Sequence, residues 1–103
     1  MEQLNEVKFD IDSEQPVEER YRIIKDLIHS NTHCIVEFKK KDGTLRTMPC
    51  TLDTNFMPPP AVEKFHQTSL LDYTTITVWC EDKNDWRAFK TNNVISIKVA
   101  DNG

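Results

Sequence analysis

The chain has 103 residues, of which 38% are hydrophobic and 29% charged, and its formal net charge is −4 at pH 7. This length suits one domain, and this balance excludes both a disordered tail and the chain-wide basic surface that non-specific nucleic-acid binding usually needs. There is no apolar run of about 18 residues to span a membrane, and the acidic start lacks the features of a secretory signal, so we expect a cytoplasmic protein.

Residues 1–13 are polar and acidic, and we predict that they form an N-terminal arm outside a main domain of residues 14–103. Val7, Phe9 and Ile11 alternate with polar residues, so a small edge strand is the alternative. We favour a loosely held arm because chain termini fray unless they are docked.

Residues 14–30 are predicted to form a helix. Pro16 suits a first helical turn, and Ser13 or Gln15 can cap it. The apolar side chains share one face, made of Val17, Tyr21, Ile24, Leu27 and Ile28. A single helix cannot bury such a stripe alone, so we expect it to pack against the rest of the domain.

From Thr32 the apolar pattern changes to a period of two, which predicts a strand with Cys34, Val36 and Phe38 on one face. The other face carries Ile35, Glu37 and Lys39. Asp42 and Gly43 then predict a hairpin, because both tolerate a positive φ. The return strand, residues 44–52, turns Met48, Cys50 and Leu52 one way, and Pro49 predicts an edge position or a bulge.

Residues 53–73 form a long connection, in which Pro58, Pro59 and Pro60 favour polyproline II geometry. Residues 61–71 are predicted to add a turn or two of helix, with Val62, Phe65 and Leu70 as its apolar points. Three more strands follow at residues 74–80, 86–90 and 94–99, separated by a polar turn at 81–85 and a tight turn at 92–93. In the last strand Ile95, Ile97 and Val99 are predicted to share one face, opposite Ser96 and Lys98.

One helix followed by five short strands is the element order of an Sm-like or SH3-like barrel, in which the strands curl around one small core. The predicted fold class is therefore mainly β, with an N-terminal α-helix and a five-stranded barrel.

Residues 36–46, 50–52, 78–79, 86–90 and 94–97 together resemble small WYL-related proteins with an Sm-like or SH3-like barrel, common in bacteriophages. The most specific parts are Lys39-Lys40-Lys41-Asp42-Gly43 and the Trp86-Arg87-Ala88-Phe89 strand followed by Val94-Ile95-Ser96. The resemblance covers about residues 23–99 and implies the barrel fold and, for a phage-encoded chain, the host cytoplasm. Larger WYL domains are linked to nucleic-acid or ligand sensing, but a literal Trp-Tyr-Leu is missing here.

The three cysteines, Cys34, Cys50 and Cys80, are an odd number at wide spacings, unlike a disulfide scaffold or the close ligand pairs of structural zinc. We expect buried free thiols, no bound metal and no cofactor. With two glycines in the chain there is no glycine-rich phosphate loop, and no local motif supports a Cys–His nucleophilic pair. We therefore predict that the chain is not an enzyme.

Three surfaces are candidates for partner binding. The first is a basic hairpin of Lys39, Lys40, Lys41 and Arg46, although lysines at a sheet edge also serve to deter aggregation. The second is the long connection, represented by Met57 and Pro59.

The third candidate surface is Trp79 beside Arg87, because Val78 and Trp79 cannot both point inward on a regular strand. Trp79 is therefore predicted to be exposed. The alternative, which we favour for Trp86, is that the tryptophans pack under the helix or the long connection.

These surfaces predict a non-enzymatic binding module, a phage-type accessory protein that binds and modulates a host or phage protein. One alternative is a regulatory nucleic-acid-binding barrel that uses the hairpin and the Trp79–Arg87 surface. Another is a small-molecule sensor or sponge. No membrane partner is expected. The sequence leaves open whether the chain forms homo-oligomers through the edge strands of the barrel.

Overall fold

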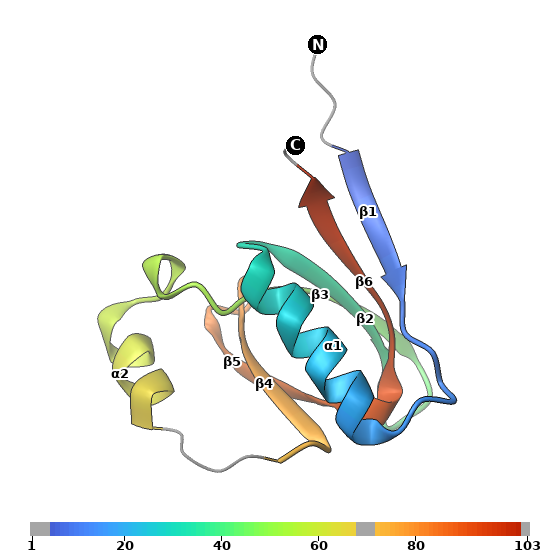
Figure 1. The fold of residues 1–103 in the computed structure, drawn as a ribbon. Coiled ribbons are helices and arrows are strands. Elements are labelled where there is room, and N and C mark those ends of the chain that lie inside the picture. The colour runs from blue at the N-terminus through green and yellow to red at the C-terminus, as the bar shows by residue number, and fades with distance from the viewer. Residues whose placement is uncertain (1–4, 68–71, 102–103) are drawn as a thin grey trace.

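A computed structural model describes residues 5–67 and 72–101 (Figure 1). Its elements in chain order are β1 (Asn5–Asp10), α1 (Val17–Ser30), β2 (Cys34–Lys39), β3 (Leu45–Thr51), the 3-10 turn η1 (Thr54–Phe56), α2 (Pro59–Gln67), β4 (Thr75–Cys80), β5 (Asp85–Lys90), the 3-10 turn η2 (Thr91–Asn93) and β6 (Val94–Asp101). Neither described helix has the length and apolar character needed to cross a membrane.

The described strands form one antiparallel sheet in the order β1-β6-β2-β3-β4-β5. The mainly-β class with a helix ahead of the barrel strands is confirmed, but the sheet has six strands where five were predicted. The extra strand comes from the predicted acidic arm: β1 pairs with β6 from Asn5↔Asp101 to Asp10↔Ser96. Val7 packs against the core and Ile11 is buried in it. Residues 5–10 therefore form the edge strand that was the alternative, and not the loosely held arm that we favoured.

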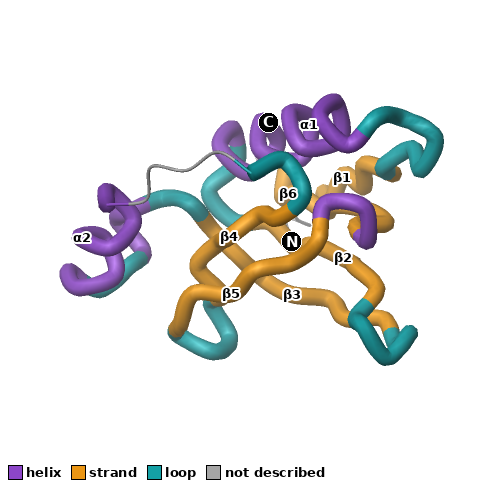
Figure 2. Tube along the Cα trace, turned by 90° about the horizontal axis from the view of Figure 1, so that it is seen from below, coloured by secondary structure: helices purple, strands orange, loops and turns teal. Residues whose placement is uncertain are grey.

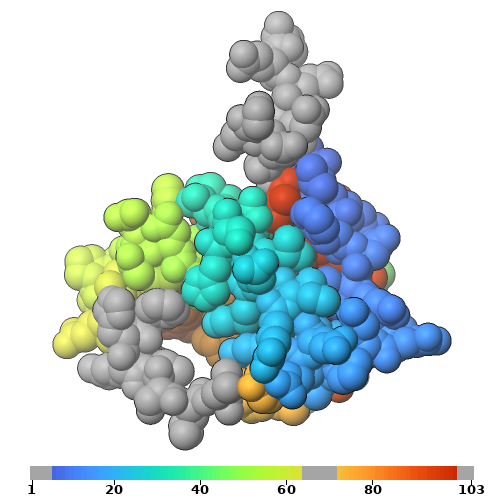
Figure 3. Space-filling model, viewed as in Figure 1, coloured from blue at the N-terminus to red at the C-terminus, as the bar shows by residue number. Residues whose placement is uncertain are grey.

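Helix α1 lies across the curved sheet (Figures 1 and 2), and its residues cover much of the face seen in Figure 3. Ile24 and Ile28 are fully buried, while Tyr21 and Leu27 pack at the margin of the core. The helix begins at Val17 with Pro16 in the N-cap position, and no side chain caps it through a hydrogen bond. The expected capping by Ser13 or Gln15 is therefore wrong, and both residues instead offer their carbonyl oxygens to Arg20.

The side chain of Arg20 is the polar anchor of α1, and the residue is only 8% exposed. Its guanidinium donates to the carbonyl oxygens of Ser13 and of Gln15, the latter at 3.0 Å. It also donates to the Asn92 side-chain oxygen at 3.0 Å and to the Asn92 carbonyl oxygen at 3.3 Å. One side chain therefore joins the start of α1, the loop that precedes it and η2.

The β2–β3 hairpin confirms the prediction from Asp42 and Gly43, with a difference in the turn. Gly43 has a φ of +88°, whereas Asp42 is not among the described residues with positive φ. The Gly43 N–H donates to the Lys40 carbonyl at 2.9 Å, and the Lys40 N–H donates to the Thr44 carbonyl at 2.8 Å. This pattern fits a three-residue loop whose last residue is left-handed, rather than a two-residue turn that needs two positive φ values.

Strand β3 bridges two parts of the sheet. It pairs with β2 from Leu45 to Cys50, but with β4 only at Cys50↔Cys80 and Thr51↔Trp79. Pro49 therefore lies in an internal strand, not in the edge strand that was one of its predicted positions. The Pro49 carbonyl accepts the Glu81 N–H at 3.0 Å at the end of the β3–β4 ladder, and because β4 pairs with β3 only from Cys50 on, the missing N–H of Pro49 lies at the end of that ladder and not within it.

Two further predictions about side-chain direction and helix limits are corrected. A register shift between Glu37 and Phe38 where β2 meets β6 turns Ile95 to solvent at 39% exposure and buries Val94 instead. Helix α2 begins at Pro59, so Pro59 and Pro60 occupy a first helical turn instead of a polyproline stretch. It ends at Gln67, and Leu70 and the side chain of Phe65 lie outside the described part of the chain.

Arg20→Lys is expected to lower the free energy of unfolding by about 1–3 kcal/mol, because an ammonium cannot reach the separated carbonyls that a guanidinium serves. The matched control is Arg22→Lys, since Arg22 on the same helix is exposed, and its partners are Glu18 at 2.6 Å and Tyr73 instead of buried carbonyls. We expect this control to leave the free energy of unfolding close to that of the parent chain. Chemical denaturation measures both values, and equal effects would contradict the anchoring role of Arg20.

Candidate functional site

The tip of the β2–β3 hairpin carries the basic run predicted from the sequence. Lys39, Lys40 and Lys41 are all exposed, and no ion pair among the described residues includes them. The Thr44 hydroxyl and backbone N–H donate to Asp42 at 2.6 and 3.0 Å and hold the pKa of that carboxyl below its usual range. The loop is thus internally braced while its lysines face water.

An apolar surface adjoins these lysines. Leu45 lies opposite Lys39 across the hairpin and is 61% exposed, and Ile35 lies opposite Pro49 on the same side of the two strands. We name this surface the hairpin face. Its residues are Ile35, Glu37, Lys39, Lys40, Lys41, Leu45, Thr47 and Pro49, with the Glu37–Thr47 pair between the Ile35–Pro49 and Lys39–Leu45 pairs. Exposed aliphatic side chains beside cations suit contact with a surface that is itself part apolar and part acidic.

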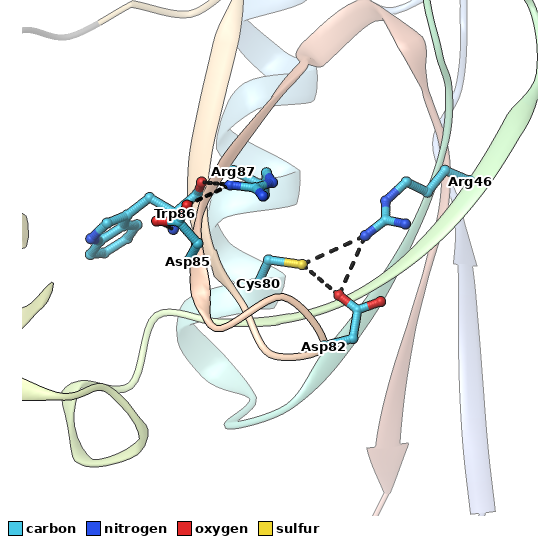
Figure 4. A network of polar contacts seen from close by, with 6 residues as sticks. All are labelled: Arg46, Cys80, Asp82, Asp85, Trp86 and Arg87. Carbon is cyan, nitrogen blue, oxygen red and sulfur yellow. Dashed lines mark hydrogen bonds and ion pairs between the residues drawn. The ribbon is translucent and has the colours of Figure 1, made fainter.

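Arg46 does not join the lysines as the sequence suggested. Its guanidinium reaches across to the β4–β5 turn and donates to Asp82 Oδ1 at 3.3 Å and to Cys80 Sγ at 3.7 Å (Figure 4). The Cys80 thiol donates to the same carboxylate oxygen at 2.7 Å, which lowers the pKa of Asp82. Arg46 therefore supports the turn from β3, with its charge balanced by Asp82.

Arg87 lies on β5 and is also paired with an acid. It donates to Asp85 Oδ2 at 2.8 Å and to the Trp86 carbonyl at 2.9 Å. Figure 4 shows Arg87 and Trp86 pointing to opposite sides of β5, as alternation along a strand requires. Arg87 is exposed, but it is not beside Trp79 on one face as predicted, because Trp79 lies opposite Trp86 and Arg87 lies opposite Val78.

The predicted exposure of Trp79 is wrong, since the residue is only 5% exposed. It packs with Met57 and Ala61 in a second cluster, on the side of β4 away from the main core, and Val62 and Trp86 contact this cluster. The Trp79 and Trp86 rings meet edge to face with centroids 5.6 Å apart. Val78 and Trp79 do face opposite sides, but both are buried because the η1–α2 connection covers the outer side of β4.

The second cluster also determines whether the long connection is available to a partner. Met57, predicted to bind a partner, is buried in the cluster, while Pro59 is exposed at the start of α2. Met57 therefore holds the connection against the sheet. Of the predicted site residues, only the three hairpin lysines remain together as an open surface in the described chain.

The cysteines form one row across three strands, in which Cys34 pairs with Cys50 and Cys50 pairs with Cys80. All three are free and buried. Burial raises the pKa of the Cys34 thiol to about 11, and it also raises the pKa values of Cys50 and Cys80. Among the residues described, no group of three or more potential metal ligands is arranged around a common point.

Sequence reasoning missed Leu45 and Ile35 as surface residues, although the strand alternation already placed Ile35 opposite Cys34 and Val36. It also missed the buried Arg20, whose signal was its spacing of four and eight residues from Ile24 and Ile28 along one helical stripe.

The folded chain is expected to resist alkylation by iodoacetamide near neutral pH, because raised pKa values leave little thiolate and burial blocks access. After unfolding in denaturant, Cys34, Cys50 and Cys80 should all react within the same labelling time. Mass spectrometry of the labelled peptides makes the comparison. Rapid labelling of Cys80 in the folded chain would contradict its burial beneath Arg46 and Asp82.

Comparison with known proteins agrees with this architecture. The WYL_2 family, described as an Sm-like SH3 beta-barrel fold, matches residues 21–95. An uncharacterized 11.5 kDa protein from the Gp31-cd intergenic region of Enterobacteria phage T4 is 36% identical over 63 residues, which is 60% of this chain and 62% of the phage protein. No solved structure matches. The chain belongs to the WYL_2 family of Sm-like SH3 β-barrel proteins.

Proposed function

We propose that this chain is a non-enzymatic, phage-type accessory module that binds a host or phage protein through the hairpin face and modulates it. The observation that carries the proposal is that Leu45, which is 61% exposed, lies directly opposite Lys39 across the β2–β3 hairpin. Leu45 is not isolated, because Ile35 at 37% exposure lies on the same side of the hairpin, and an exposed apolar patch is typical of an interaction site. Its cationic neighbours select an acidic or mixed partner surface.

Charge distribution supports a protein over a nucleic acid as the partner. The chain carries a formal charge of −4, and both candidate arginines are paired, Arg46 with Asp82 and Arg87 with Asp85. Trp79, which the nucleic-acid alternative needs on the surface, is buried in the second cluster. What remains open is a short cationic loop joined to aliphatic residues, a combination closer to a protein contact than to a phosphate-binding groove.

The state of the thiols supports a non-enzymatic role. A thiol nucleophile acts as the thiolate, and catalytic cysteines have lowered pKa values in partly exposed sites. Here burial raises the pKa values of all three thiols. Asp82 raises the pKa of Cys80 further, because it accepts the hydrogen bond of the protonated thiol.

Leu45→Asp is expected to reduce partner capture about tenfold or more, since loss of a central interface contact commonly costs more than a factor of ten in affinity. The matched control is Ile23→Asp, because Ile23 on α1 is an exposed aliphatic residue outside the hairpin face. Tagged parent and variant chains are captured from expressing bacteria and quantified by mass spectrometry, with circular dichroism to verify folding. A partner retained at stoichiometric yield by Leu45→Asp, or no specific protein captured by the parent chain, would remove the proposal.

The open lysines favour one second candidate, a nucleic-acid-binding barrel. Neutralising about three phosphates would give a slope of about −2 to −3 in log affinity against log salt concentration. Reversing Lys39, Lys40 and Lys41 to Glu should then abolish that slope, whereas Lys98→Glu, an exposed lysine on β6, should leave it unchanged. A gel shift with single- and double-stranded probes at low salt separates the two candidates, because the protein-binding proposal predicts no shift.

A further inference from the structure

Strand β1 has one paired edge and one open edge. Its inner edge pairs with β6 over all six residues, and among the described strands none pairs with its outer edge. Figure 1 shows β1 at the margin of the sheet with β6 on one side of it. The strand has no proline, glycine or bulge to interrupt a new ladder.

The backbone direction identifies which groups are available at that edge. The Ile11 N–H donates to the Ile95 carbonyl of β6 at 2.9 Å. Backbone groups alternate between the two edges along a strand, so Val7, Phe9 and Ile11 direct theirs to β6. The N–H and C=O groups of Glu6, Lys8 and Asp10 therefore point to the open edge.

We infer that the open edge of β1 binds β1 of a second copy of this chain, antiparallel and with the two-fold axis at Phe9. In this register Lys8 of each copy lies opposite Asp10 of the other, and the two residues form a hydrogen-bonded backbone pair. Lys8 and Asp10 of each copy thus meet an opposite charge across the axis. Within one strand, Lys8 Nζ already lies 3.8 Å from Asp10 Oδ1, and both side chains are solvent-exposed. The Lys8 and Asp10 side chains of the two copies therefore form a cluster of alternating charge.

The same register covers the apolar side of the strand. Phe9 is 39% exposed, the most exposed aromatic side chain on the sheet strands of the described chain. On the axis it lies opposite Phe9 of the second copy as a non-hydrogen-bonded pair, the closer of the two pair types in an antiparallel ladder. Val7 then lies opposite Ile11 of the second copy, which continues the apolar row.

Charge excludes the neighbouring register and selects this one. With the axis at Lys8, lysine would face lysine and Glu6 would face Asp10, so every charged pair on the strand would repel. With the axis at Val7, Lys8 meets Glu6, but Phe9 moves toward the end of the ladder and stays partly open. The Phe9 axis alone combines opposite charges with central burial of the ring.

Sedimentation velocity of the full chain tests the association. The parent chain should sediment at twice its 12.0 kDa mass at high concentration. Lys8→Asp should raise the dimer dissociation constant at least tenfold, and Lys8→Asp combined with Asp10→Lys should restore it, since opposite charges then meet again. The matched control is Lys98→Asp, which changes the lysine opposite Lys8 on β6, away from the open edge, and should leave the dimer unchanged.

A backbone variant and a cross-link test the same edge without relying on charge. Lys8→Pro removes an N–H that points to the open edge, so it should give a folded monomer by circular dichroism and sedimentation. Phe9→Cys should form a disulfide-linked dimer on oxidation, whereas Val7→Cys should not. A monomeric parent chain at all concentrations, a dimer that survives Lys8→Pro, or cross-linking at position 7 in place of 9 would overturn the inference.

Discussion

The structure depends on burying the apolar stripe of α1 against the concave side of the sheet. Ile24 and Ile28 lose essentially all solvent contact, and each such side chain contributes about 1.5–3 kcal/mol when fully buried. Their partners come from distant parts of the chain, including Val36 in β2, Val78 in β4 and Ile97 in β6. Hydrophobic burial has no direction, however, so it does not by itself fix where along the sheet the helix begins.

Arg20 supplies that direction. Its guanidinium donates hydrogen bonds to the carbonyl oxygens of Ser13 and Gln15, in the loop before α1, and of Asn92, in η2. Since η2 is the corner between β5 and β6, the same side chain positions the corner where the sheet turns back over the core. A buried cation is costly unless its donors are satisfied, and the fixed geometry of those carbonyls therefore makes the helix position specific.

The sequence was sufficient for features set by neighbours along the chain. Alternation placed Cys34, Val36 and Phe38 on the inner side of β2, and Gly43 marked the hairpin, because side-chain direction and positive φ are local properties. It was insufficient where a distant segment decides the environment. Trp79 is correctly opposite in direction to Val78, but only the fold of the connection through Met57 and Ala61 reveals that its side of β4 is covered.

The same distinction explains the errors at the ends of the chain. Val7 and Phe9 gave an alternating pattern, yet whether a terminal strand docks depends on a free edge of β6, which lies about ninety residues away in sequence. Ile95 followed the alternation of Ile97 and Val99, but a register shift against β2 reversed its direction. Neither a bulge nor an available partner edge has a reliable signal in a single strand.

The partner-binding part of the candidate site was only half predictable for a related reason. The three lysines could be found from their order in the chain, but the pairing of Arg46 with Asp82 depends on how far β3 extends past the β4–β5 turn. Net charge is a property of the whole chain, whereas a binding surface depends on which charges remain open after such pairs form. The −4 charge and a cationic hairpin are therefore compatible.

The filled interior of the barrel bears on where recognition takes place. Val36, Met48, Cys50, Ile76 and Val78 occupy the inner face with at most 1% exposure, and Phe38 and Phe89 stack with centroids 5.4 Å apart. Small barrels are filled by their own side chains in this way, so a ligand inside this core would have to displace packed groups. Because a fold of this kind serves many functions, specificity must come from residues that the fold leaves outside. On this chain the surfaces that we propose for this role are the hairpin face and the open edge of β1.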